Sequence, residues 1–123
     1  MFCEFQIGNR GRIVQENALA YAVRDAFPVA SGHTLIVSKR HVADYFGLTL
    51  DEVYAVNEML HGQQKLLREA DPSIEAYNIG MNCGEVAGQT VLHCHVHLIP
   101  RRMGDSEDPR GGVRHVIPGK GAY

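Results

Sequence analysis

The sequence lacks the features that mark several broad classes of protein. It has no tryptophan and three cysteines, an odd number with no CxxC pair, which argues against a disulfide framework and suits a reducing cytoplasm. Its net charge of −2 gives no basic surplus for nucleic acid or an anionic membrane. No apolar run approaches the roughly 18 residues of a membrane span, and the opening MFCEFQIGNR lacks the apolar core of a secretory signal. We therefore expect a cytoplasmic protein that binds neither nucleic acid nor membrane.

What remains is the composition of one soluble globular domain. The chain has 123 residues, of which 45% are hydrophobic and 21% charged, enough for one core and too few for two domains. We expect residues 1–123 to form that single domain. Seven histidines are present, and three of them lie in one short stretch.

The hydrophobic pattern predicts an α+β fold. Runs rich in apolar and β-branched residues read as strands at 12–16, 18–25, 33–38, 76–82 and 90–99, and the C-terminal part could hold one more near 113–117. Apolar residues recur at helical spacing from Leu50 to Ala70, between a Thr49-x-x-Glu52 capping box and a closing Asp71-Pro72. This order of elements implies a mainly antiparallel sheet with one long helix packed on one face.

The predicted strand 90–99 carries the chemistry. Because side chains alternate along a strand, Leu92, Cys94, Val96 and Leu98 should face the core, and the histidines at 93, 95 and 97 should share the other face, about 7 Å apart. Three titratable rings on one face repel one another when charged and lose solvation, so such a cluster indicates a functional site.

Two kinds of chemistry fit three histidines. They could bind Zn²⁺, although alternate residues of one strand converge poorly on a tetrahedral ion and no carboxylate stands beside them. Alternatively, one imidazole could attack a phosphate. The preceding Gly84, Gly88, Gln89 and Thr90 favour the second, since they offer unhindered backbone N–H groups and short polar side chains to an anion.

The residues here resemble the histidine triad (HIT) family. The match consists of His-Cys-His-Val-His-Leu-Ile at 93–99, Ala-Gly-Gln-Thr-Val at 87–91, the segments 31–41 and 77–82, and Asp25. The stretch 104–118 is similar to the ending of bacterial family members described as diadenosine tetraphosphate hydrolase-like. This resemblance implies a HIT-like α+β fold, an antiparallel sheet of about five strands with one long helix, and a two-fold homodimer. It also implies attack of the middle histidine on the α-phosphate of a nucleotide, through a nucleotidyl-histidine intermediate.

The resemblance assigns catalytic roles by position. His95, in the middle, would be the nucleophile and must present a neutral Nε2, with its Nδ1–H held by a carbonyl near His93. His97 would contact the phosphate or protonate the leaving group. His93 would orient its neighbours, His33 would support the triad from behind, and Thr90 would touch the phosphate near the leaving group.

It also assigns nucleotide-binding roles. Asp25 would accept hydrogen bonds from both ribose hydroxyls, although an aspartate there could instead cap the following turn. Asn82 and Gln89 would line the phosphate path. The base would lie against Tyr21, Val23 and Phe27, of which the first two could equally be ordinary core residues.

We expect no cofactor and no metal. Some family members hold zinc through a CxxC pair and two histidines, but this chain has a single matching cysteine, so Cys3, His41 and His93 would be the residues to inspect. The leading substrate is a (di)nucleoside polyphosphate, because residues 101–123 hold five cationic residues against three acidic ones. The alternatives are a nucleoside phosphoramidate hydrolase, a non-catalytic nucleotide-binding signalling module and a metal-dependent enzyme.

Overall fold

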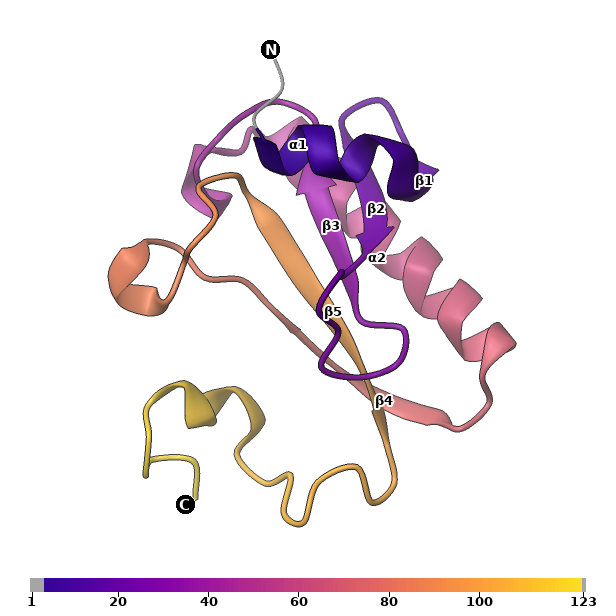
Figure 1. Cartoon of the computed structure of the whole chain (residues 1–123), viewed down its shortest axis with the longest axis vertical. Helices are drawn as coiled ribbons and strands as arrows, with labels where there is room; N and C mark the ends of the chain where they lie inside the picture. Colours follow the sequence, from indigo (N-terminus) through magenta and orange to yellow (C-terminus); the bar gives the residue numbers. More distant parts are fainter. Residues whose placement is uncertain (1–3, 123) are drawn as a thin grey trace.

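The structure, a computed structural model, describes residues 4–122 and is built on one five-stranded antiparallel sheet (Figure 1). The strands are β1 (Ile13–Glu16), β2 (Ala20–Arg24), β3 (Thr34–Ser38), β4 (Ile74–Gly80) and β5 (His95–Arg102), and they pair in the order β1-β2-β3-β5-β4. The helices are α1 (Glu4–Asn9) and α2 (Leu50–Ala70), with 3₁₀ turns η1 (Arg10–Arg12), η2 (Tyr45–Gly47), η3 (Glu85–Ala87) and η4 (Gly112–Val116). The predicted fold, with one long helix, is confirmed.

Helix α2 covers one face of the sheet. Its predicted capping box is present: Thr49 Oγ1 accepts from the Glu52 N–H at 3.2 Å, and Glu52 Oε1 accepts from the Thr49 N–H at 2.9 Å. Val56 and Met59 of the helix pack in one buried cluster with Ala20, Ala22, Ile36 and Val96 of the strands. Within residues 4–122, no helix has the length and apolar character that crossing a membrane requires.

The histidine-bearing face of the sheet lies opposite α2. Val37 pairs with His95, and Leu35 pairs with His97, so these side chains share a face. The same face carries a second buried cluster, formed by Tyr21, Val23, Leu35 and Val37. The site therefore rests on a buried apolar cluster.

The predicted bounds of the last strand are wrong at both ends. β5 begins at His95, so residues 90–94 lie before the strand, and Leu92 is 53% exposed where we expected it in the core. At the other end, β5 continues through Pro100 to Arg102. β3 pairs only as far as Leu98, so β5 tolerates a residue without an N–H at position 100.

Two further predictions need correction. β4 runs from Ile74 to Gly80, two residues earlier than the predicted 76–82. Residues 112–116 form the 3₁₀ turn η4 and not a strand, because Gly111 and Gly112 both take positive φ and turn the chain away from the sheet. η4 belongs to the C-terminal tail (residues 103–122), which Figure 1 shows running beneath the β4 end of the sheet.

Candidate active site

His95 is held in one tautomer by the residue two positions before it. Its Nδ1–H donates to the backbone carbonyl of His93 over 2.6 Å. A neutral imidazole has a single N–H, so this bond leaves a lone pair on Nε2. The sequence predicted this contact, and a lone pair on Nε2 is what a nucleophilic histidine requires.

His97 is held in the opposite tautomer by a chain of hydrogen bonds. The Val29 N–H donates to His33 Nδ1 over 3.1 Å, so the proton of His33 is on Nε2. That Nε2–H donates to His97 Nδ1 over 2.9 Å, which leaves the proton of His97 on its own Nε2. His95 and His97, whose ring centroids are 5.4 Å apart, therefore carry a lone pair and an N–H at equivalent ring positions.

The surroundings keep the imidazole rings of His33 and His97 uncharged near neutral pH. Burial lowers the pKa of His33, and the nearby Asp25 carboxylate opposes that shift only in part. Burial, followed by the proximity of His95 and His33, lowers the pKa of His97. Neutral rings preserve the tautomers of His33 and His97 that the hydrogen bonds select.

His93 is fully buried, and both of its ring nitrogens are used within the protein. Its Nε2–H donates to the Ser38 carbonyl over 2.7 Å, and its Nδ1 accepts from His41 Nδ1–H over 2.8 Å. We expected the side chain of His93 to share one face with those of His95 and His97, but His93 precedes β5 and does not. Its contribution to the site is the backbone carbonyl that holds His95.

Asp25 stands behind His33 at the end of β2. Its Oδ1 accepts from the Phe27 N–H over 2.9 Å, which is the turn-capping contact that the sequence left as an alternative. Its Oδ2 lies 3.4 Å from His33 Nε2, with the side chain 16% exposed. Carboxylate oxygens each accept more than one hydrogen bond, so the ribose role stays a prediction beside these two contacts.

Gln89 holds the loop before β5. Its buried side chain accepts from the Gly84 N–H over 2.8 Å and donates to the carbonyls of Ala43 and Val91 over 2.6 and 3.0 Å. The amide is thus engaged in fixing the loop, whereas we expected it along the phosphate path. Thr90, next to it, is exposed.

The residues expected around the base are not gathered at one place. Tyr21 and Val23 are core residues of the second cluster, and the Tyr21 hydroxyl donates to Gln6 Oε1 over 2.6 Å. Phe27 projects into solvent, 86% exposed. Asn82 lines the cavity described next.

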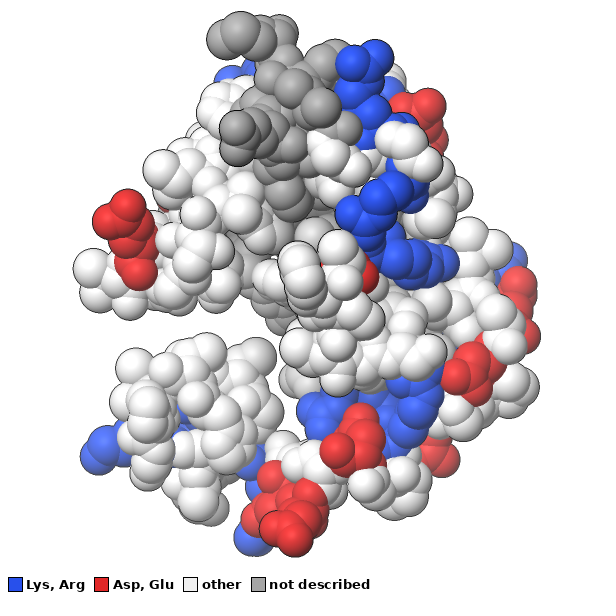
Figure 2. Space-filling view, viewed as in Figure 1, with Lys and Arg blue, Asp and Glu red and all other residues white. Residues whose placement is uncertain are grey.

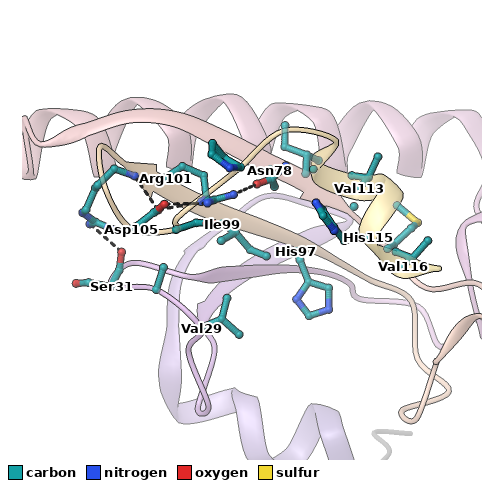
Figure 3. A pocket seen from close by; sticks show the side chains of 18 of the residues that line it. Val29, Ser31, Asn78, His97, Ile99, Arg101, Asp105, Val113, His115 and Val116 are labelled. Atoms are coloured by element: carbon teal, nitrogen blue, oxygen red, sulfur yellow. Dashed lines mark hydrogen bonds and ion pairs between the residues drawn. The ribbon is translucent and has the colours of Figure 1, made fainter. Parts of the chain in front are cut away.

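A cavity of about 860 Å³ opens beside His97 (Figure 3). It is lined by the loop 29–31, by β4 and the two residues after it, by the end of β5 and by the C-terminal tail. Apart from His97 and Asn82, the predicted site residues do not include this wall, which contains Asn78, Ile99, Val113, His115 and Val116. The tail has no periodic pattern that would have placed it near the histidines.

Three possible metal ligands meet at the site. One donor atom from each of Asp25, His33 and His97 lies within 4.8 Å of the others. However, the Val29 N–H occupies His33 Nδ1, so His33 Nε2 carries a proton and has no lone pair to offer a metal. The arrangement fits a hydrogen-bond chain better than a metal centre. Of the other inspected set, His41 and His93 are in contact through their Nδ1 atoms, and Cys3 lies outside the described residues.

Two relatives matched by sequence and one solved structure are similar to this chain. An adenosine 5'-monophosphoramidase of Candida albicans is 36% identical over 71% of this chain and 59% of its own length. A bis(5'-nucleosyl)-tetraphosphatase (asymmetrical) of Schizosaccharomyces pombe is 33% identical over 85% of this chain and 56% of its own length. The crystal structure of a hypothetical histidine triad nucleotide-binding protein from Sulfolobus tokodaii superposes with a TM-score of 0.75 at 30% identity, over 83% of this chain and 70% of that one.

The family itself follows from the match to a family model. The model of the HIT domain family matches residues 8–104, which include α2, all five strands and the three histidines of the motif. The chain belongs to the HIT domain family.

Proposed function

We propose that this chain cleaves a nucleotide at its α-phosphate through a nucleotidyl intermediate on His95. The observation that carries the proposal is the pair of opposite tautomers: a lone pair on His95 Nε2 beside an N–H on His97 Nε2. The two named relatives support it, since both names denote enzymes that act on nucleotide derivatives at phosphorus.

The reaction balances in two steps. His95 Nε2 attacks the α-phosphorus, and the bond from phosphorus to the leaving group breaks, with its electron pair going to that group. Water then attacks the same phosphorus, the N–P bond breaks, and the pair returns to Nε2. An amine leaving group takes a proton from solvent in the first step, and the attacking water gives a proton back to solvent in the second, so the protons balance. Throughout, His93 O holds the His95 Nδ1–H, and His97 Nε2–H donates to a phosphate oxygen, where negative charge builds up.

The charge of the C-terminal residues no longer favours a polyphosphate over a phosphoramidate. Three of the five cations counted there are in ion pairs: Arg101 with Asp105 at 2.8 Å, Arg102 with Asp71 at 2.8 Å and Arg110 with Asp108 at 2.9 Å. We keep the (di)nucleoside polyphosphate as the leading substrate class, on the resemblance of the sequence ending, and a nucleoside phosphoramidate as its alternative.

The proposal is tested by trapping the intermediate. The protein is mixed with a slowly cleaved adenylated substrate, and its peptides are analysed by mass spectrometry for an adenylated His95. The His95→Ala variant should lose turnover by several orders of magnitude and still bind nucleotide, because only the nucleophile is gone. A variant that keeps more than a few per cent of the activity, or an adenyl group on another residue, would contradict the assignment.

We further propose that residues 1–123 act as one domain and assemble as a two-fold homodimer. β1 and β4 are the edge strands of the sheet, and β4 is the longer, with seven residues of which one is buried. An edge of this length needs cover, and antiparallel pairing of sheets or packing of helices across a two-fold axis supplies it. Light scattering at micromolar concentration should give twice the mass of the chain, whereas a monomer mass would refute the dimer.

A further inference from the structure

Helix α1 covers part of the sheet face that carries the histidines. Its residue Gln6 accepts from the Tyr21 hydroxyl at Oε1 over 2.6 Å and donates from Nε2 to the Lys39 carbonyl over 2.7 Å. Tyr21 belongs to the buried cluster on that face. Figure 1 shows α1 in front of the sheet and α2 behind it. Two hydrogen bonds from one side chain thus fix α1 to the start of β2 and the end of β3.

The chain that follows α1 stays beside β2 as far as the end of that strand. The Arg12 guanidinium donates to the Arg24 carbonyl, and Ile13 of β1 pairs with Val23. Asp25, the residue expected to hold the ribose, comes directly after β2. Figure 2 shows Lys and Arg side chains gathered over this end of α1 and the neighbouring strands, and such a cationic surface attracts an anionic nucleotide. A nucleotide bound at Asp25 therefore lies next to the end of α1.

Asn9, the last residue of α1, carries a buried amide without a partner. The residue is 4% exposed, and among the residues that the structure describes its Nδ2 is the one buried side-chain nitrogen or oxygen that makes no hydrogen bond. Leaving such an N–H unpaired costs free energy, so folded proteins pair nearly all of them. Gln6, one turn earlier on the same face of the helix and 2% exposed, has both ends of its amide bonded. The Asn9 amide is therefore a group whose partner a ligand can supply.

The base of a nucleotide held at Asp25 fits between α1 and the buried cluster. The base is joined to the ribose carbon beside the 2'-hydroxyl, so it can extend from Asp25 over Val23 and Tyr21, whose apolar and aromatic surfaces suit a flat ring. Both residues are covered in this structure, so the base enters when α1 lifts and the two Gln6 bonds break. The six residues of α1 are fewer than the roughly 12 that an isolated helix needs in water, so α1 holds its place weakly.

From this we infer that Asn9 recognises adenine: the base enters beneath α1, the Asn9 Nδ2–H donates to its N7, and Oδ1 accepts from its N6 amino group. The inference rests on the proposed function and adds the identity of the base. An asparagine amide matches the N6 and N7 edge of adenine with two hydrogen bonds. Guanine presents two acceptors there, O6 and N7, so Oδ1 would face another oxygen. The site therefore selects adenine over guanine.

The test compares nucleotides that differ at the atoms Asn9 should contact. Isothermal titration measures Kd for adenosine 5'-monophosphate, for its 7-deaza analogue, which carries a C–H in place of N7, and for guanosine 5'-monophosphate. The parent protein should bind adenosine 5'-monophosphate about tenfold more tightly than either of the others, because each of them leaves a buried group unpaired. Asn9→Leu removes the amide at similar size and should reduce both ratios of Kd to within about twofold of one. Gln6→Leu, the matched control on the same helix face, should keep both ratios.

Stability without nucleotide gives a second readout. Asn9→Leu should raise the urea midpoint, because it removes an unpaired buried group, whereas Gln6→Leu should lower it through the loss of two hydrogen bonds. The inference is overturned if the parent binds the 7-deaza analogue as tightly as adenosine 5'-monophosphate, if Asn9→Leu keeps the preference, or if Asn9→Leu lowers the midpoint, since the amide would then have a partner in the free protein. A parent that shows the preference but forms no adenylated His95 supports the role of Asn9 and refutes the proposed reaction.

Discussion

At the residue scale, Asp25 combines two observed contacts with one expected contact. Its carboxylate caps the turn at Phe27, approaches His33 and, by its position, should accept hydrogen bonds from the ribose hydroxyls. We expect Asp25→Ala to weaken binding of ribonucleotides by about tenfold, because charge-assisted hydrogen bonds to a carboxylate are worth about 1.5 kcal/mol or more. Binding of 2',3'-dideoxynucleotides should change much less. Isothermal titration of both ligands measures the difference.

The Asp25→Asn variant separates the turn-capping role of Asp25 from its expected ribose-binding role. An asparagine keeps an oxygen that can accept from the Phe27 N–H, so this variant should unfold at the parent's denaturant midpoint. If Asp25→Ala destabilises the fold and both kinds of nucleotide lose affinity equally, the capping role accounts for Asp25 and the ribose role is wrong.

The sequence predicted the roles of single residues best where the hydrogen-bond partner lies close in the sequence. The bond from His95 to the carbonyl of His93 spans two residues, and the resemblance to the family implied it. The bond from His33 to His97 spans 64 residues, and it exists because the register of β3 against β5 places Leu35 opposite His97. No local pattern contains that register, so the tautomer of His97 became visible only in the fold.

At the scale of elements, the start of α2 joins helix capping to an ion pair. Glu52, 3% exposed, completes the capping box and also accepts from Arg40, whose guanidinium lies 2.7 Å away. Hydrogen bonds from Arg40 lower the pKa of Glu52, so the carboxylate is charged at neutral pH. Thr49→Ala should lower the free energy of unfolding by about 1 kcal/mol through loss of the cap. Urea denaturation measures this free energy. The control variant Thr49→Ser keeps the hydroxyl and should have a denaturation midpoint close to that of the parent. Equal midpoints for the alanine variant and the parent would show that the cap adds no stability.

The start of β5 shows why an alternating pattern was not enough to set its bounds. The Cys94 N–H donates to the Val42 carbonyl over 2.7 Å, and Gln89 bonds to the Ala43 carbonyl, so the segment before His95 is held by the loop 42–43. Leu92 consequently points outward although it continues the apolar series. Cys94 is buried as expected, which raises the pKa of its thiol to about 11.

At the scale of the whole molecule, the sheet and the long helix could be predicted and the tail could not. The sheet follows from strand-forming runs, of which β2 and β3 are buried on both faces. The helix follows from a periodic apolar stripe with a cap at its start. The tail is positioned by side-chain hydrogen bonds of Arg101 and by close packing of glycines. Those interactions leave no periodic signal, and they build the wall of the cavity.

Three histidines, two of them buried and one partly buried, give the molecule a predictable dependence of stability on pH. Burial lowers the pKa of His33, His93 and His97 below the usual 6.5. Below pH 6.5 these histidines therefore bind protons in the unfolded chain that they do not bind in the folded chain. The stabilising effect of the neutral histidines is complete above pH 6.5 and is lost as the pH falls. Each such histidine contributes a slope of up to about 1.4 kcal/mol per pH unit. Urea unfolding between pH 8 and pH 5 should show a plateau followed by a decline.

Carboxylates with lowered pKa values do not contribute to the decline in stability between pH 8 and pH 5, and one variant tests which group causes that decline. Glu52 and Asp71 have lowered pKa values, that of Asp71 about 2, so their stabilisation is present above pH 4.5 and constant over the range measured. His33→Gln removes one of the three titrating rings and keeps an N–H that can face His97, so the decline below pH 6.5 should become shallower whatever the stability at pH 8. A decline as steep as that of the parent would show that His33 is not among the groups responsible. Constant stability of the parent from pH 8 to pH 5 would show that these rings do not resist protonation, and the neutral tautomer of His97 would then lose its support.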